Sequence, residues 1–278
     1  MCIRDRSGVG SLIYGLTSIS SILGDNKLLK DAIRANELVT ESAISEDNVL
    51  HIPGGSAGMV CALLALFRVT GDQKFLRKAS ICGRHLLARR QEIGNGLIGW
   101  KLGSDGSAPT GFSRGTAGIA YALLSLYRET GENSFYDAAE EAIAHEGIKN
   151  DGQVAIGVGN RAHSKSQILK VPGSIQGWCN GPRGIALSRI ATLDVFDNEL
   201  VRTQIETPLH MTENSSRLEG DHLCCGTASV GEVLLSAAAR YQYPAWKKMA
   251  IQLVSETVSR GTKNNDFKPE SRFDELYN

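Results

Sequence analysis

Residues 55–71 read GSAGMVCALLALFRVTG, and residues 115–131 read GTAGIAYALLSLYRETG. The two stretches align without gaps, and the alignment extended to Ala79 and Ala139 contains 12 identities in 25 positions. An internal repeat of this kind is a fold-level signal, because each copy is one structural unit that packs against the next. Weaker copies of the pattern begin at Gly8, Gly181 and Gly226.

Each copy reads as a turn, an apolar helix, a glycine and a second helix. The first helix is too densely apolar at Leu63, Leu64 and Leu66 to lie on a surface, so we expect it to be buried. Gly71 and Gly131 stand where a glycine ends a helix, and the more amphipathic segments after them are expected to be outer helices. The glycines that open the first helix permit a tight turn and a close approach of backbone.

Strand signals are few, and only the β-branched segment 154–158 reads as a short hairpin. We therefore predict an all-α chain that forms an α/α toroid, in which glycine-opened inner helices alternate with outer helices. Turns at equivalent positions would then face the same central cavity.

Composition restricts the function. The formal net charge of +0 gives no electrostatic footprint for nucleic acid. No apolar run approaches the ~18 residues that a membrane span needs. Residues 1–7 lack the apolar region and cleavage site of a signal peptide, and we interpret them as a non-native segment before a domain of residues 8–278. We expect a cytoplasmic protein, in which six cysteines indicate a metal or catalytic site before disulfides.

Three of the cysteines lie in the turns. Cys179 precedes Gly181 by two residues, Cys224 precedes Gly226 by two residues, and Cys225 follows Cys224 directly. Thiolates suit Zn²⁺, and three protein ligands would leave the fourth position of the metal open, as in catalytic sites. The other interpretation is that these cysteines are small buried hydrophobes. No Cys-x-x-Cys pair is present, so the zinc prediction depends on the shared position in the turns.

Other chemically capable residues have simpler explanations. Cys61 and Cys82 lie mid-helix among apolar residues and are expected to be structural. Trp178 is expected to be a packing anchor, and His222 is either a group that orients a thiolate or a plain helix-entry residue. Surface or structural roles are expected for the histidines outside the turns, His85, His145, His163 and His210. A solvated helix face is expected for Glu140, Glu141 and Glu146.

With these residues identified, the chain resembles the lanthionine synthetase cyclase family, and most closely the C-terminal cyclase domain of type 2 (LanM-type) lanthipeptide synthetases. The resemblance covers almost the whole chain from Gly8. It rests on GFSRGTAGIAYAL at 111–123, on WCNG at 178–181 and on DHLCCG at 221–226.

The resemblance implies an α/α toroid that holds one Zn²⁺, with Cys179, Cys224 and Cys225 as ligands in a three-cysteine variant of the family's site. The implied reaction is the addition of a peptide cysteine thiol to dehydroalanine or dehydrobutyrine, which closes a thioether ring. The substrate would be a dehydrated precursor peptide with its leader. An upstream dehydratase domain would be the partner, and this chain would be a fragment that is incomplete at the C-terminus because it lacks the last repeat.

The acid–base half of the site departs from the family. Arg114 stands in place of the histidine of the family's GFSHG motif, and His51 stands in place of its aspartate. Arginine cannot deliver a proton at neutral pH, although it can stabilise an enolate oxygen. His51 could donate the proton instead. We take His51, Arg114, Asn180 and His222 as the candidate catalytic residues.

Two other functions remain open. A non-catalytic peptide-binding module would keep the fold, with or without zinc, and the departures at 51 and 114 favour it. An α/α-toroid glycosidase would require paired carboxylates at the mouth of the cavity. The residue before the first glycine of each turn is instead Gly54, Arg114, Asn180 or Cys225, so we rank the glycosidase last.

Overall fold

The computed structural model describes residues 8–94, 97–103, 105–148, 154–156, 167–169, 178–179, 181–213, 220–223, 226–264 and 267. The chain divides into two compact units. The N-terminal unit comprises Met1–His145 with Gly157–Ser164, and the C-terminal unit comprises Glu146–Ile156 with Lys165–Asn278. Each unit is described by itself.

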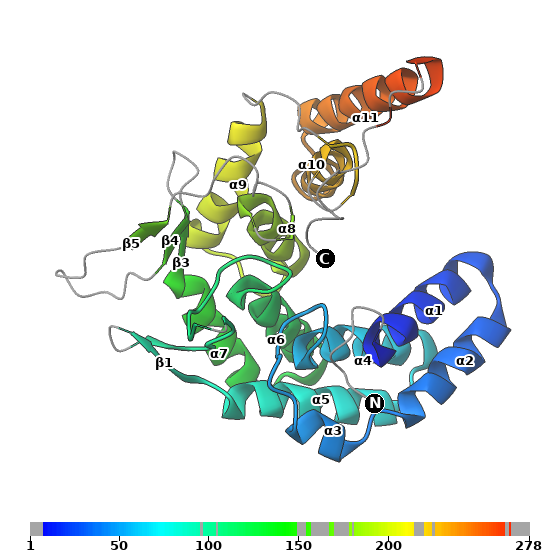
Figure 1. Ribbon diagram of the computed structural model, residues 1–278, viewed down its shortest axis with the longest axis vertical. Coiled ribbons are helices and arrows are strands. Elements are labelled where there is room, and N and C mark those ends of the chain that lie inside the picture. Colours follow the sequence, from blue (N-terminus) through cyan, green and yellow to red (C-terminus); the bar gives the residue numbers. More distant parts are fainter. Residues whose placement is uncertain are drawn as a thin grey trace. The chain divides into compact units, whose positions relative to one another are not determined.

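The N-terminal unit is built from helices and one hairpin (Figure 1). The helices are α1 (Val9–Leu23), α2 (Asn26–Glu37), α3 (Glu41–Ser45), α4 (Ser56–Thr70), α5 (Gln73–Ala88), α6 (Thr116–Thr130) and α7 (Asn133–His145). The hairpin pairs β1 (Gln91–Gly94) with β2 (Leu97–Gly99) in antiparallel register. Trp100, just after the hairpin, is fully buried, and its indole N–H donates to the carbonyl of Leu86 at 2.8 Å.

The glycine-opened helices of this unit pack in series, α1 on α4 and α4 on α6. Helices α2, α5 and α7 each pack against the glycine-opened helix that precedes them (Figure 1). The predicted repeat is therefore seen directly, because α4 and α6 have the same length and each packs against the preceding glycine-opened helix and the helix that follows it. Gly71 and Gly131 end them in the left-handed conformation, with φ of 69° and 68°, as the sequence predicted.

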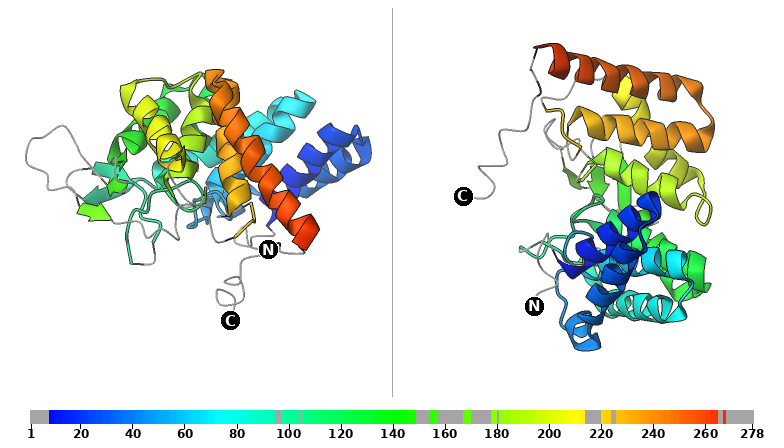
Figure 2. Two further views of the ribbon diagram at one scale, coloured as in Figure 1. Left: turned by 90° about the horizontal axis from the view of Figure 1, so that it is seen from above. Right: turned by 90° about the vertical axis from the view of Figure 1, so that its right-hand side faces the viewer.

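The C-terminal unit has a three-stranded antiparallel sheet and four helices. The sheet order is β3 (Glu146–Ile148), β4 (Val154–Ile156) and β5 (Gln167–Leu169). The helices are α8 (Pro182–Thr192), α9 (Glu199–Glu213), α10 (Thr227–Tyr241) and α11 (Pro244–Asn264). Helix α8 packs against α9 and α10, and α11 lies along α10 (Figure 2).

The prediction of an all-α chain of glycine-opened helices, each followed by a partner helix, is confirmed. The short β segment near residue 154 is also present, although as the middle strand of a sheet. No helix in the described part of the chain combines the length and apolarity that crossing a membrane requires.

The expected exposure of Glu146 is wrong. Its side chain is 1% exposed, and a carboxylate oxygen accepts from Nη2 of Arg189 at 2.5 Å. Arg189 also donates from Nε to Gln204 at 2.8 Å and from Nη1 to Ser188 at 3.1 Å. Gln204 donates to the main-chain carbonyl of Glu146, which closes the network. The buried ion pair therefore joins β3, α8 and α9.

Candidate active site

The turns that open the helices share one backbone conformation. The glycine before each helix is extended, with φ of −128° at Gly55, −121° at Gly115, −112° at Gly181 and −100° at Gly226. Glycine has no side chain that could cap the helix, so the first helical amides find acceptors in the preceding loop. The amide of Thr116, for example, donates to the carbonyl of Pro109 at 3.0 Å. The register inferred from the sequence is thus a structural register.

Close packing of backbone explains the glycines. A Cβ on Gly58 would overlap the carbonyl oxygen of Ile52, and one on Gly118 would overlap that of Phe112. A Cβ on Gly226 would lie 2.6 Å from the carbonyl oxygen of Gly220. These are backbone atoms that cannot move aside, so the predicted role of the glycines is confirmed.

The turns before α4 and α6 lie side by side. The amide of Ile52 donates to the carbonyl of Ser113 at 3.2 Å, which brings together the neighbours His51 and Arg114. His51 is half-buried, and Nδ1 of its ring is enclosed without a hydrogen-bond partner among the described atoms. Arg114 is exposed. Burial, and then the positive charge of Arg114, lower the pKa of His51 below its usual value.

The loop before α4 contains a carboxylate whose role was not predicted from the sequence. Asp47 is 6% exposed, and its carboxylate accepts from the amide of Ser56 at 2.7 Å and from the Ser56 hydroxyl at 2.7 Å. It also accepts from the amides of Val49 at 2.9 Å and Leu50 at 3.3 Å. An aspartate shortly before a helix can indicate an N-cap, but Asp47 lies nine residues before Ser56, too far for the usual N-cap pattern.

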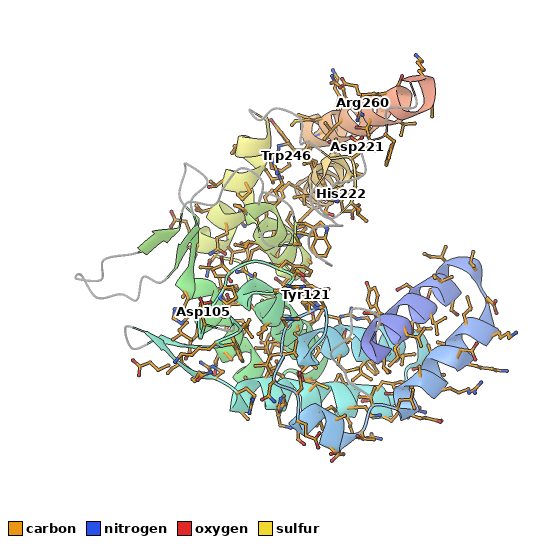
Figure 3. The ribbon with its side chains drawn as sticks, viewed as in Figure 1. Asp105, Tyr121, Asp221, His222, Trp246 and Arg260 are labelled. Atoms are coloured by element: carbon orange, nitrogen blue, oxygen red, sulfur yellow. The ribbon has the colours of Figure 1, made fainter. Side chains whose placement is uncertain are left out.

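Aromatic packing supports the turn before α6. The ring of Phe112, in this turn, lies 5.4 Å from that of Tyr121. Tyr121 lies on α6 (Figure 3). Burial raises the pKa of Tyr121 to about 12. Tyr121 is therefore a neutral phenol at physiological pH.

In the C-terminal unit, Cys179 lies in the turn before α8 and is partly exposed. Pro182 is the first helical residue, a position where its missing N–H costs nothing. Arg183 is buried, and this burial lowers its pKa. Trp178 is half-buried next to Cys179, and its predicted role as an anchor stays a prediction.

His222 lies in the turn before α10. Its carbonyl accepts from the amide of Gly226 at 3.0 Å, and the carbonyl of Gly220 accepts from the amide of Thr227 at 2.8 Å. The neighbouring Asp221 is 3% exposed and accepts from Nη2 of Arg260 on α11 at 2.6 Å (Figure 3). This ion pair fixes the entry to α10 and was missed, because 39 residues separate the partners.

Asn180, Cys224 and Cys225 lie outside the described residues. Within the part of the chain that the structure describes, no three histidine, cysteine or acidic side chains are grouped as metal ligands. Helix α8 packs against α10, so Cys179 and the turn that contains the Cys224-Cys225 pair in sequence open two neighbouring helices. Three thiols are a donor set that suits Zn²⁺.

Comparison with known proteins decides the family. The family model described as lanthionine synthetase C-like protein matches residues 6–277. This chain belongs to that family. No curated protein sequence matches this lanthionine synthetase C-like protein.

Solved structures share the fold of this lanthionine synthetase C-like protein. Nisin cyclase matches with a TM-score of 0.66 and 14% identity, over 94% of this chain and 70% of its own. The Lin0763 protein from Listeria innocua matches with a TM-score of 0.60 and 10% identity, over 94% and 75%. An unsaturated glucuronyl hydrolase specific for heparin matches with a TM-score of 0.58 and 18% identity, over 88% and 70%. At these identities the matches show the fold alone, which supports the predicted α/α class.

The remaining cysteines and histidines in the described part of the chain have structural or surface positions. Burial raises the pKa of Cys61 and that of Cys82 to about 12, so neither thiol is ionised at neutral pH. Nε2 of His85 lies 2.8 Å from the carbonyl oxygen of Asp47, and His145 is buried. His210 is exposed beside Trp246, and His163 lies outside the described residues.

Proposed function

We propose that the protein is a lanthipeptide cyclase. It adds cysteine thiols of a dehydrated precursor peptide to dehydroalanine or dehydrobutyrine, which forms lanthionine or methyllanthionine rings. The observation that carries this proposal is the family match over residues 6–277, joined to cysteines at one register position before two neighbouring helices. The name of the structural relative nisin cyclase agrees with it.

Zinc is the cofactor of this proposal, and Cys179, Cys224 and Cys225 would hold it. The donor set fits, because three thiolates leave one position for a substrate sulfur. Cys179 is partly exposed, as a ligand at an open site must be. When bound, zinc would supply a lowered pKa for the peptide thiol, whose ordinary value is about 8.5.

His51 and Arg114 are the proposed acid–base half. Because its pKa is lowered, His51 is mainly neutral at pH 7 and can accept the proton that the peptide thiol loses. After the C–S bond forms, His51 returns this proton to the α-carbon of the enolate, so no other proton source is needed. Arg114 is exposed and always charged, and it would stabilise the enolate oxygen.

His222 and Asn180 have supporting roles in the proposal. His222 is partly exposed two residues before Cys224, from where it would orient the thiolates. Asn180 shares the register of Arg114, directly before the glycine of its turn, and would donate its amide to the peptide.

The biological setting follows from the type 2 (LanM-type) resemblance. An upstream dehydratase domain would supply the dehydrated peptide, with its leader, in the cytoplasm. The same chain would therefore receive its substrate from a neighbouring domain.

The alternative functions make different demands on these residues. A catalytically impaired peptide-binding module is favoured by Arg114, which cannot replace a proton-transferring histidine. A hydrolase is suggested by the structural relative that acts on heparin, but it requires free carboxylates. Near the described turns, Asp47 is occupied by amides and Asp221 by Arg260.

The test is a cyclisation assay on a synthetic peptide with one dehydroalanine and one cysteine. Cyclisation leaves the mass unchanged, so ring formation is measured as loss of alkylation by N-ethylmaleimide. We expect the wild-type protein to accelerate this loss over buffer and over Cys179→Ala. A wild-type rate equal to the rate in buffer would reject the cyclase and favour the binding module. Equal rates for wild type and Cys179→Ala, both above buffer, would reject Cys179 as a required zinc ligand.

A further inference from the structure

The carboxylate of Asp47 closes the loop that carries His51. Its four hydrogen bonds reach Val49 and Leu50 on one side of the histidine and Ser56 on the other. Such a buried carboxylate, with amide and hydroxyl donors, forms strong charge-assisted bonds. The loop is therefore held at both ends by one side chain.

The main chain at His51 is fixed as well. The amide of His51 donates to the carbonyl of Val49 at 2.7 Å, and the carbonyl of His51 accepts from Gly55 at 2.9 Å. Leu50 has a φ of 63°, the left-handed region that a branched side chain rarely adopts. Such a conformation is strained and persists only where the surroundings enforce it. The bonds of Asp47 to the amides of Leu50 and Ser56 enforce it here.

A carboxylate is used in this turn although other turns manage without one. The first helical amide of α6, at Thr116, donates to the carbonyl of Pro109 at 3.0 Å. The first helical amide of α10, at Thr227, donates to the carbonyl of Gly220 at 2.8 Å. The corresponding amide of α4, at Ser56, donates to Asp47. Among these three described turns, only the turn that contains His51 uses a charged acceptor, Asp47, for the first helical amide.

The charges that face His51 come from two elements. Arg114 belongs to the neighbouring turn, and its charge disfavours the protonated ring. Asp47 belongs to the loop of His51 itself, and its charge favours the protonated ring. His85, on α5, reaches the carbonyl oxygen of Asp47 at 2.8 Å and supports the loop from behind.

We propose that Asp47 is a positioning residue that holds His51 in place for proton transfer and partly balances the charge of Arg114. This inference rests on the proposed function, because it assigns His51 the proton of the cyclisation step. Asp47 itself does not contact substrate, since its carboxylate is buried and occupied. It acts through His51, which would otherwise be harder to protonate.

The experiment is a titration of His51 by NMR in the full chain with labelled histidine, using His51→Gln to assign its resonance. In Asp47→Asn we expect the pKa of His51 to fall below its wild-type value, because a negative charge is lost while Arg114 remains. Asp72→Asn is the matched control, since it removes the carboxylate cap of α5, which accepts from the Lys74 amide at 2.9 Å. This control should leave the His51 titration unchanged.

An unchanged His51 titration in folded Asp47→Asn would overturn the inference. If Asp47→Asn alone is too unstable, it is measured in the Gly15→Ala background, which adds helix stability in the same unit. The titration needs no substrate and no metal, so it gives its answer even if cyclisation fails. If the protein cyclises the peptide but the pKa of His51 is unchanged in Asp47→Asn, only the role of Asp47 is rejected. If the pKa of His51 falls but the protein does not cyclise the peptide, only the proposed function is rejected.

Discussion

His51 and His222 occupy the same position in two copies of one turn. The carbonyl of His51 accepts from the amide of Gly55 at 2.9 Å, and the carbonyl of His222 accepts from the amide of Gly226 at 3.0 Å. In both copies the glycine then opens an apolar helix. The repeat thus places imidazoles at equivalent points of the two units, one followed by a glycine pair and one by a cysteine pair.

The residues around this glycine differ between the two units. In the N-terminal unit, the side chains beside the glycine are a histidine and an arginine in adjacent turns. In the C-terminal unit, Cys225 holds the position of Arg114, directly before the glycine, and Cys179 and Cys224 lie one residue earlier. The repeated turn therefore carries the proposed acid–base residues in one unit and the proposed metal ligands in the other.

The close backbone contact at Gly58 predicts a large effect of a methyl group. Gly58→Ala would place a Cβ against the carbonyl oxygen of Ile52, so we expect the free energy of unfolding to fall by about 2–3 kcal/mol. Gly15→Ala is the control, because nothing lies within 4 Å of its added Cβ and α1 is helical there. It should raise the free energy of unfolding by about 0.5–1 kcal/mol. Urea denaturation measures both, and equal effects would contradict the packing described.

The buried ion pair of Arg189 and Glu146 predicts that substitutions of the two residues have strongly non-additive effects on the free energy of unfolding. Arg189→Met leaves a carboxylate buried without its charged partner, so the free energy of unfolding should fall by about 3–5 kcal/mol. The double variant Arg189→Met/Glu146→Leu should be more stable than Arg189→Met alone. Arg202→Ala, which breaks an exposed pair with Asp197, should change little. A double variant less stable than Arg189→Met would argue against the pair.

Acid should destabilise the N-terminal unit through His145. Burial lowers the pKa of His145 below its ordinary value of 6.5, so on acidification the unfolded chain takes up this proton before the native chain. The free energy of unfolding should therefore decrease as pH falls through 6.5 toward the lower native value. His145→Gln should reduce this slope in denaturation curves between about pH 7 and pH 5. An unchanged slope would show that the ring protonates freely in the folded protein.

The repeat made most of the fold predictable. The match between residues 55–71 and 115–131 predicted two helices of equal length, each ended by a left-handed glycine, at 71 and 131. These features are local, because they depend on apolar density and on residues a few positions apart.

The features that were missed depend on long-range contacts. Glu146 follows an acidic helix end, so nothing near it in sequence reveals Arg189, 43 residues later. Asp47 caps α4 from nine residues away, beyond the spacing of an ordinary N-cap. The cysteine register is a feature of the sequence, and its metal stays a prediction, since Cys224 and Cys225 lie outside the described residues.

Zinc content tests the central claim most directly. Metal analysis of purified protein would compare wild type with Cys179→Ala and Cys225→Ala, and with Cys61→Ala as the control for loss of a mid-helix thiol. We expect about one zinc per chain in wild type and in Cys61→Ala, and its loss in the other two variants. No zinc in the folded wild-type protein, or zinc retained in Cys179→Ala, would contradict it.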